Sequence, residues 1–187
     1  ICERMPAMFC MGNHDDMGFS SYFTKEDKYY SEYATYFTNQ LWGSYEHNGP
    51  IERPIANHAF DYGNVHFSII GTSDYKEMNE WLIEQAEKTD KKWKFAVHHF
   101  PICFAGPGIE IDDSYPSLRD GMDKYDIVFS GHEHCSDATT HTTASGNTIS
   151  DFATTSLTMY PLQYRYVEMY EETITYEAKT VDSIDTD

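Results

Sequence analysis

Residues 126–134 read Asp126-Ile127-Val128-Phe129-Ser130-Gly131-His132-Glu133-His134. In this segment an apolar run of strand length passes directly into glycine and histidines. The same change occurs after residues 93–97, where His98-His99 follows, and after residues 8–11, where Gly12-Asn13-His14-Asp15-Asp16 follows. Polar loops after buried strands are typical of α/β proteins, which carry their sites at strand ends. The sequence therefore predicts an α/β fold with three polar motifs on one edge of a sheet.

The segment between the first two motifs alternates strand and helix patterns. Val65 to Ile70 predicts a strand, and the following helix carries Met78, Trp81, Leu82 and Ala86 on one face. Asp74 and Glu77 form a plausible capping box for that helix. Residues 19–62 are Tyr-rich and acidic, and the aromatic spacing over 29–37 predicts one more helix.

The end of the chain shows a period of two. Residues 148–158, 164–170 and 173–181 predict strands, with Glu171-Glu172 as a short turn, so we expect a C-terminal β-meander. Residues 182–187 are expected to be a frayed tail. Residues 104–113 follow the His98 motif and predict a rim or lid of the site.

Composition sets limits on partners. The 187 residues fit a single domain spanning residues 1–187, and hydrophobic residues make up 40% of it. The formal net charge of -18 opposes binding to nucleic acid or to an anionic membrane surface. It also repels anionic substrates, so a phosphate site here needs local positive charge, most simply from metal ions. Cys2, Cys10, Cys103 and Cys135 form neither a C-x-x-C pair nor a dense disulfide framework, so the redox compartment and localisation stay open.

The three polar motifs supply imidazoles and one carboxamide, which suit zinc, iron, manganese or nickel. Each motif alone has a plainer interpretation. The Gly12 motif fits an ordinary turn in which Asp15 caps a helix, His98-His99 fits one buried and one exposed strand residue, and residues 132–134 fit a solvated loop. Their joint occurrence, each after a strand, favours a metal site.

In order, Gly12-Asn13-His14-Asp15, His98 after a strand, and Gly131-His132-x-His134 resemble the last three motifs of the calcineurin-like metallophosphoesterases. The stretch Thr155 to Val167 is similar to the region after G-H-x-H in the bacterial branch related to cyclic-nucleotide phosphodiesterases. The resemblance implies a β-sandwich flanked by helices, in a four-layer αββα arrangement. It also implies a small phosphoester substrate and two divalent or trivalent metal ions.

The resemblance also implies residue roles. Asn13, His98 and His132 would bind one metal together with a bridging Asp, and His134 would bind the other. His98 is preferred to His99, whose role stays open, because the first histidine of an H-H-x-P stretch is the family ligand. His14 would contact the phosphate and protonate the leaving oxygen, with Asp15 orienting its ring. The implied reaction is direct attack by a metal-bound hydroxide.

The family's D-x-H and G-D motifs are absent from the sequence. They normally precede G-N-H-D, so we expect the chain to be truncated at its N-terminus, to lack the N-terminal strands, and to bind metal weakly. The alternative is a non-catalytic scaffold or binding module of the same fold. A zinc peptidase is disfavoured because no H-E-x-x-H occurs, and a serine hydrolase because no G-x-S-x-G occurs.

Overall fold

The computed structural model describes residues 8, 10, 12, 57–70, 75–101, 121–143 and 145–182. Eight strands and one long helix lie in these ranges: β1 Asn57–Tyr62, β2 Val65–Ile70, α2 Tyr75–Lys88, β3 Trp93–His98, β4 Ile127–Ser130, β5 Asp137–Thr142, β6 Thr148–Ala153, β7 Gln163–Met169 and β8 Ile174–Thr180. None of the helices in these ranges is long and apolar enough to cross a membrane.

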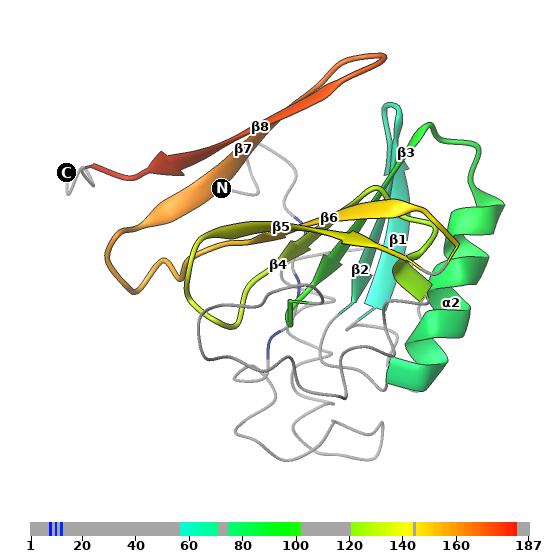
Figure 1. Ribbon diagram of the computed structural model, residues 1–187, viewed down its shortest axis with the longest axis horizontal. Coiled ribbons are helices and arrows are strands. Elements are labelled where there is room, and N and C mark those ends of the chain that lie inside the picture. The colour runs from blue at the N-terminus through cyan, green and yellow to red at the C-terminus, as the bar shows by residue number, and fades with distance from the viewer. Residues whose placement is uncertain are drawn as a thin grey trace, which may run out of the picture.

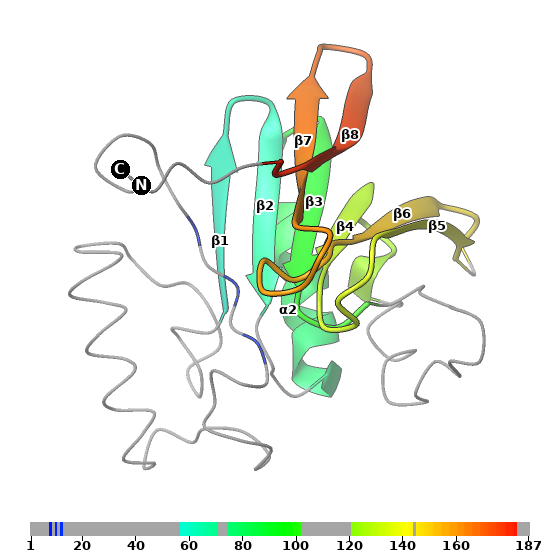
Figure 2. The ribbon, with the colours of Figure 1, turned by 90° about the vertical axis from the view of Figure 1, so that its left-hand side faces the viewer.

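Six strands form one sheet in the order β1-β2-β3-β4-β6-β5, and β7 and β8 form a separate antiparallel hairpin. Neighbouring strands from β2 to β6 run parallel, whereas β1 and β5 are antiparallel edges. Figure 2 shows α2 behind this sheet and the β7–β8 hairpin in front of it. The helix and the hairpin therefore cover opposite faces of the sheet (Figure 1).

The face covered by α2 holds the larger core. Trp81, Leu82 and Ala86 of the helix are buried there, as their spacing predicts, against residues of the sheet and of the segment before β4. The sheet residues are mostly small or branched, as in Ala96 and Val128. This burial explains why α2 forms in this chain, since a helix gains most of its stability from packing its apolar face.

The opposite face holds an aromatic core. Phe95 and Phe152 are buried in it, and Met169 and Ile174 of the hairpin pack against it. Arg165 of β7 also donates to the carbonyl of Ala153 at 2.7 Å, which ties the hairpin to the end of β6. Arg165 makes further hydrogen bonds to Ser136 and to the carbonyl of Asp137, so apolar packing and several charge-assisted bonds hold the hairpin on the sheet.

A series of linked side-chain hydrogen bonds crosses the core beneath α2. Tyr125 donates its hydroxyl proton to the carbonyl of Leu82 at 3.0 Å, because a carbonyl can only accept. The same hydroxyl lies 2.7 Å from Ser68 Oγ, and Ser68 lies 3.0 Å from Nε2 of His66. His66 contacts Asp61 at 2.7 Å through its other nitrogen. These hydrogen bonds link α2, β2 and β1 to the segment that precedes β4.

Most of the predicted elements are confirmed. The strand at 65–70, the helix that follows, and the strands at β3, β4, β7 and β8 occur within one or two residues of their predicted bounds. The turn at Glu171-Glu172 is confirmed. The α/β class is confirmed as well, and the described residues supply one helical layer, the six-stranded sheet and the hairpin.

The prediction of a C-terminal β-meander is wrong. The strand predicted at 148–158 ends at Ala153 and pairs with β4 in the main sheet, so only β7 and β8 form the terminal hairpin. Strands β1 and β5 were not predicted. Met8 and Cys10 belong to no assigned strand. The helix at 29–37, the cap residue Asp74, the loop at 104–113 and the tail beyond Asp182 lie outside the described residues.

Candidate metal centre

The parallel strands bring two histidine motifs to one edge of the sheet. His98 is the last residue of β3, and Ser130 is the last residue of β4, directly before Gly131-His132-Glu133-His134. Because β3 and β4 are parallel neighbours, their carboxyl ends lie side by side. The edge predicted from the sequence therefore exists, with His98 and His132 on adjacent strand ends.

His98 is held as a neutral ring with a defined tautomer. Its Nδ1 lies 2.6 Å from the carbonyl of Phe100, so Nδ1 carries the proton that it donates. Burial lowers the pKa of His98 to about 4, and the hydrogen bond to Phe100 opposes this shift only in part. The neutral ring then keeps a lone pair on Nε2, which is the form that binds a metal.

The loop after β4 is fixed by its backbone. Gly131 N donates to the carbonyl of His99 at 3.0 Å, and Glu133 N donates to Gly131 at 2.7 Å. His132 and His134 have φ angles of 64° and 55°, the left-handed region that side chains other than glycine adopt at a cost. Two such residues in one short loop indicate local backbone strain, which is common at functional sites.

His99 joins the second and third motifs. Its Nε2 lies 3.1 Å from Nδ1 of His132, and the two rings meet edge to face with centroids 5.0 Å apart. The ring of Phe100 lies 4.5 Å from that of His132 and 5.9 Å from that of His98. His98, His99, Phe100 and His132 therefore form one aromatic cluster at the strand ends.

The first motif reaches the same cluster through Gly12. A Cβ atom built on Gly12 would lie 2.7 Å from Cε1 of His99, which no side chain tolerates without a shift. Two residues earlier, Cys10 donates its Sγ proton to the carbonyl of Ile70, the last residue of β2, at 3.2 Å. Asn13, His14 and Asp15 directly follow Gly12 in the sequence and lie outside the described residues.

His134 contacts a different part of the chain from the other histidines of the motifs. Its Nδ1 lies 3.2 Å from Sδ of Met159, in the segment between β6 and β7, and its side chain is exposed. Within the described ranges, no three His, Cys, Asp or Glu side chains converge closely enough to hold a metal ion. The donor chemistry of His98 fits a metal ligand, whereas the described residues alone do not complete a coordination shell.

The structure reveals a hydrogen-bonded pair of residues behind the histidine loop that was not predicted from the sequence. Ser130 and Asp151 are both buried, and they meet across β4 and β6 directly behind the histidine loop. The available signal was a carboxylate inside the apolar strand Ile149 to Ala153. A charged residue in such a strand indicates a partner, because burial of an unpaired carboxylate is costly.

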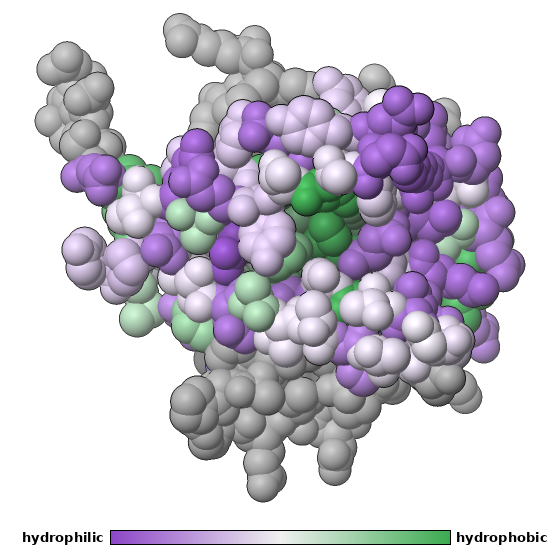
Figure 3. All heavy atoms as spheres, turned by 45° about the horizontal axis from the view of Figure 1, so that its top comes forward, coloured by the Kyte–Doolittle hydropathy of each residue, from purple (hydrophilic) through white to green (hydrophobic). Residues whose placement is uncertain are grey.

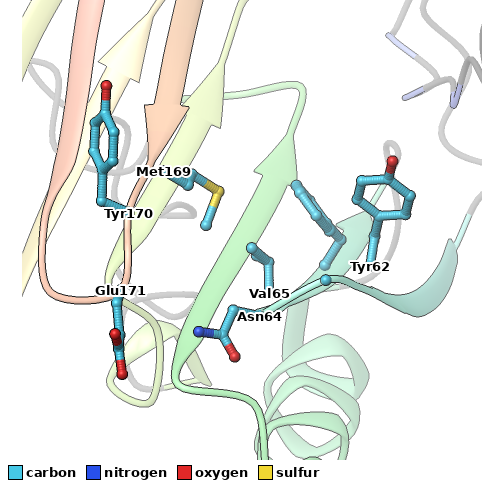
Figure 4. Close-up of a pocket in the computed structure, with 8 residues that line it drawn as sticks. Tyr62, Asn64, Val65, Met169, Tyr170 and Glu171 are labelled. Carbon is cyan, nitrogen blue, oxygen red and sulfur yellow. The ribbon is translucent and has the colours of Figure 1, made fainter.

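A separate pocket lies at the opposite edge of the sheet. Its volume is about 520 Å³, and it opens between the β1–β2 turn and the β7–β8 turn, over residues 62–65, Phe67 and 169–171. Figure 4 shows Met169 reaching toward Val65 across it, with Tyr62 at the far side. Figure 3 shows a strongly hydrophobic area within a mostly hydrophilic surface. Because the pocket borders the β1–β2 and β7–β8 turns and not the histidine cluster, it is not part of the candidate centre.

Comparison with known proteins extends these observations. The profile of the calcineurin-like phosphoesterases matches residues 1–136, which include all three motifs. No curated protein matches the sequence. A crystal structure of a dimetal phosphatase from Danio rerio is similar, with 14% sequence identity and a TM-score of 0.42. The alignment covers 84% of this chain and 50% of that one, so the chain spans about half the length of that protein.

Proposed function

Because the chain belongs to the calcineurin-like phosphoesterase family, we propose that it hydrolyses small phosphate mono- or diesters at a site of two divalent or trivalent metal ions. Manganese, iron, zinc and nickel all fit imidazole and amide ligands. The observation that carries the proposal is the meeting of the motifs at one sheet edge. His99 contacts His132 of the third motif, and its ring lies against Gly12 of the first.

The proposed ligands keep the roles that the family resemblance implies. Asn13, His98 and His132 would hold one ion, and His134 would hold the other. The neutral tautomer of His98 supports its role, since its Nε2 keeps a lone pair while Nδ1 donates to Phe100. Nδ1 of His134 donates to the sulfur of Met159, so Nε2 of the neutral ring is the nitrogen that would bind an ion.

The metal ions would supply the local positive charge that attracts and polarises a phosphoryl group in a chain of net charge -18. His14 would donate a proton to the leaving oxygen, and Asp15 would orient the His14 ring and stabilise its protonated form. The half-buried ring pair of Phe100 and His132 would shield one side of the site from water, which strengthens these charge interactions.

The test compares hydrolysis of p-nitrophenyl phosphate and bis-p-nitrophenyl phosphate with added Mn²⁺ in the wild-type chain and in His98→Asn. The Asn amide preserves a donor near Phe100 but removes the Nε2 lone pair. We expect metal-dependent turnover and calorimetric Mn²⁺ binding in the wild type, both weak, and neither in the variant. The ratio of the two substrates then separates a monoesterase from a diesterase.

His141→Gln on β5 is the matched control, because this histidine lies on the antiparallel edge strand beyond β6. It should keep the wild-type rate and affinity. A non-catalytic scaffold of the same family is the competing function. That alternative predicts no metal-dependent hydrolysis in any of the three proteins, and this result would remove the enzyme proposal.

A further inference from the structure

His99 has no role among the proposed ligands, yet it contacts parts of all three motifs. It follows His98 directly, its carbonyl accepts from Gly131 N at 3.0 Å, and its ring reaches Nδ1 of His132 at 3.1 Å. The ring also lies against Gly12, where a Cβ atom would sit 2.7, 2.8 and 3.2 Å from three of its atoms. A half-buried side chain with this many constraints has a fixed orientation.

We propose that His99 is the positioning residue of the centre, which accepts a hydrogen bond from Nδ1 of His132 and so fixes the tautomer and direction of that ring. This inference rests on the proposed function, in which His132 is a ligand. With Nδ1 protonated and bonded to His99, Nε2 of a neutral His132 keeps its lone pair for a metal ion.

The carboxylate that follows His132 in the sequence does not set this tautomer. Glu133 is the described carboxylate near His132, and its Oε1 lies 4.0 Å from Nε2, beyond hydrogen-bond length. Residue 132 sits in the strained left-handed region with φ of 64°, but this backbone angle does not define which ring nitrogen carries the proton. Phe100 stacks edge to face on His132 at 4.5 Å, which limits ring tilt but leaves the proton position undetermined.

Gly12 is the second residue that takes part in this positioning, because it holds the His99 ring in place. Any larger residue there would push the His99 ring away from its present place, since the atoms that a Cβ would meet are Cε1, Nδ1 and Nε2 of that ring. The glycine before Asn13 thus places the first motif and the His99 ring in direct contact. Movement of His99 would then disturb the third motif through His132.

The first measurement is ¹⁵N NMR of the histidine rings in the metal-free chain. The expected result is a proton on Nδ1 and a bare Nε2 in His132, retained in His99→Gln, whose amide oxygen replaces the accepting nitrogen. His99→Phe keeps the ring shape but cannot accept, and it should give a mixture of tautomers. A proton on Nε2 of His132 in the wild type would overturn the proposal.

The second measurement is Mn²⁺ affinity by calorimetry. We expect His99→Phe and Gly12→Ala to weaken binding by about tenfold or more, the usual effect of removing a residue that orients a ligand, while His99→Gln stays near the wild type. Equal affinities in His99→Phe and the wild type would refute the role of His99 and leave the proposed function intact. If no protein binds Mn²⁺, the proposed function fails, and the NMR result still decides the role of His99.

Discussion

Ser130 Oγ donates a 2.8 Å hydrogen bond to Oδ1 of Asp151, and both side chains are almost fully buried between β4 and β6. Ser130 is the last strand residue before the histidine loop, so this bond anchors the start of that loop. Loss of a donor to a buried carboxylate costs more than loss of a neutral contact, because the charge has been removed from water.

Ser130→Ala should therefore lower the free energy of unfolding by about 1 to 3 kcal/mol, measured by urea denaturation. Ser150→Ala is the matched control on β6, since its side chain makes none of the hydrogen bonds found in the described part of the chain. It should change stability by less than about 0.5 kcal/mol. Equal effects of the two substitutions would show that the Asp151 contact contributes nothing.

His134→Gly should be more stable than His134→Ala by about 1 kcal/mol, because residue 134 has a φ of 55° and only glycine adopts this region without strain. Both substitutions remove the contact with Met159, so their difference isolates the backbone. The measurement is the denaturation midpoint of each variant.

The control pair is Thr140→Gly and Thr140→Ala on β5, an exposed position in a regular strand. Glycine should be the less stable of that pair by about 0.5 to 1 kcal/mol, the reverse of the order at residue 134. If glycine is the less stable residue at both positions, the loop is not strained at residue 134.

Tyr125→Phe should destabilise the chain by about 1 to 3 kcal/mol. The hydroxyl donates to the Leu82 carbonyl and contacts Ser68, and both of these partners would lose it inside the core. Tyr164→Phe is the control, because Tyr164 is 45% exposed on the outer face of the hairpin and should tolerate the change. Similar small losses in both variants would mean that water replaces the lost hydroxyl.

The strands that were predicted and the strands that were missed differ in composition. β3 and β4 are continuous apolar runs bounded by polar residues, which is the pattern of a buried parallel strand. β5, Asp137 to Thr142, contains no large apolar side chain, and it forms because it pairs with β6 at the sheet edge. Such an edge strand depends on its partner, so local sequence could not predict it.

The candidate site also has one part that the sequence predicts and one part that it does not. The strand-end position of His98 and His132 follows from local patterns, because each histidine comes directly after an apolar run. The contacts of His99 with Gly12 and His132 depend on how strands distant in sequence are aligned in the sheet. No spacing within the sequence encodes that alignment, so the contacts of His99 could not be predicted and required the structure.

The buried, neutral state of His98 predicts a pH dependence of stability in the metal-free chain. Its pKa is about 4 in the folded protein, whereas an exposed histidine has a pKa near 6.5, so the unfolded chain takes up the proton first as the pH falls. Stability is therefore complete above about pH 6.5 and is lost progressively toward pH 4.

Between about pH 7 and pH 5 the loss assigned to His98 is about 2 kcal/mol. Carboxylates titrate over part of this range as well, so the quantity to measure is the difference between the wild type and His98→Asn in urea denaturation with a metal chelator present. His98→Asn keeps a donor for the Phe100 carbonyl but has no ring to protonate, and its stability should fall less over the same interval. Parallel losses in the two proteins would mean that the wild-type ring becomes protonated without unfolding, which is incompatible with its burial at the end of β3.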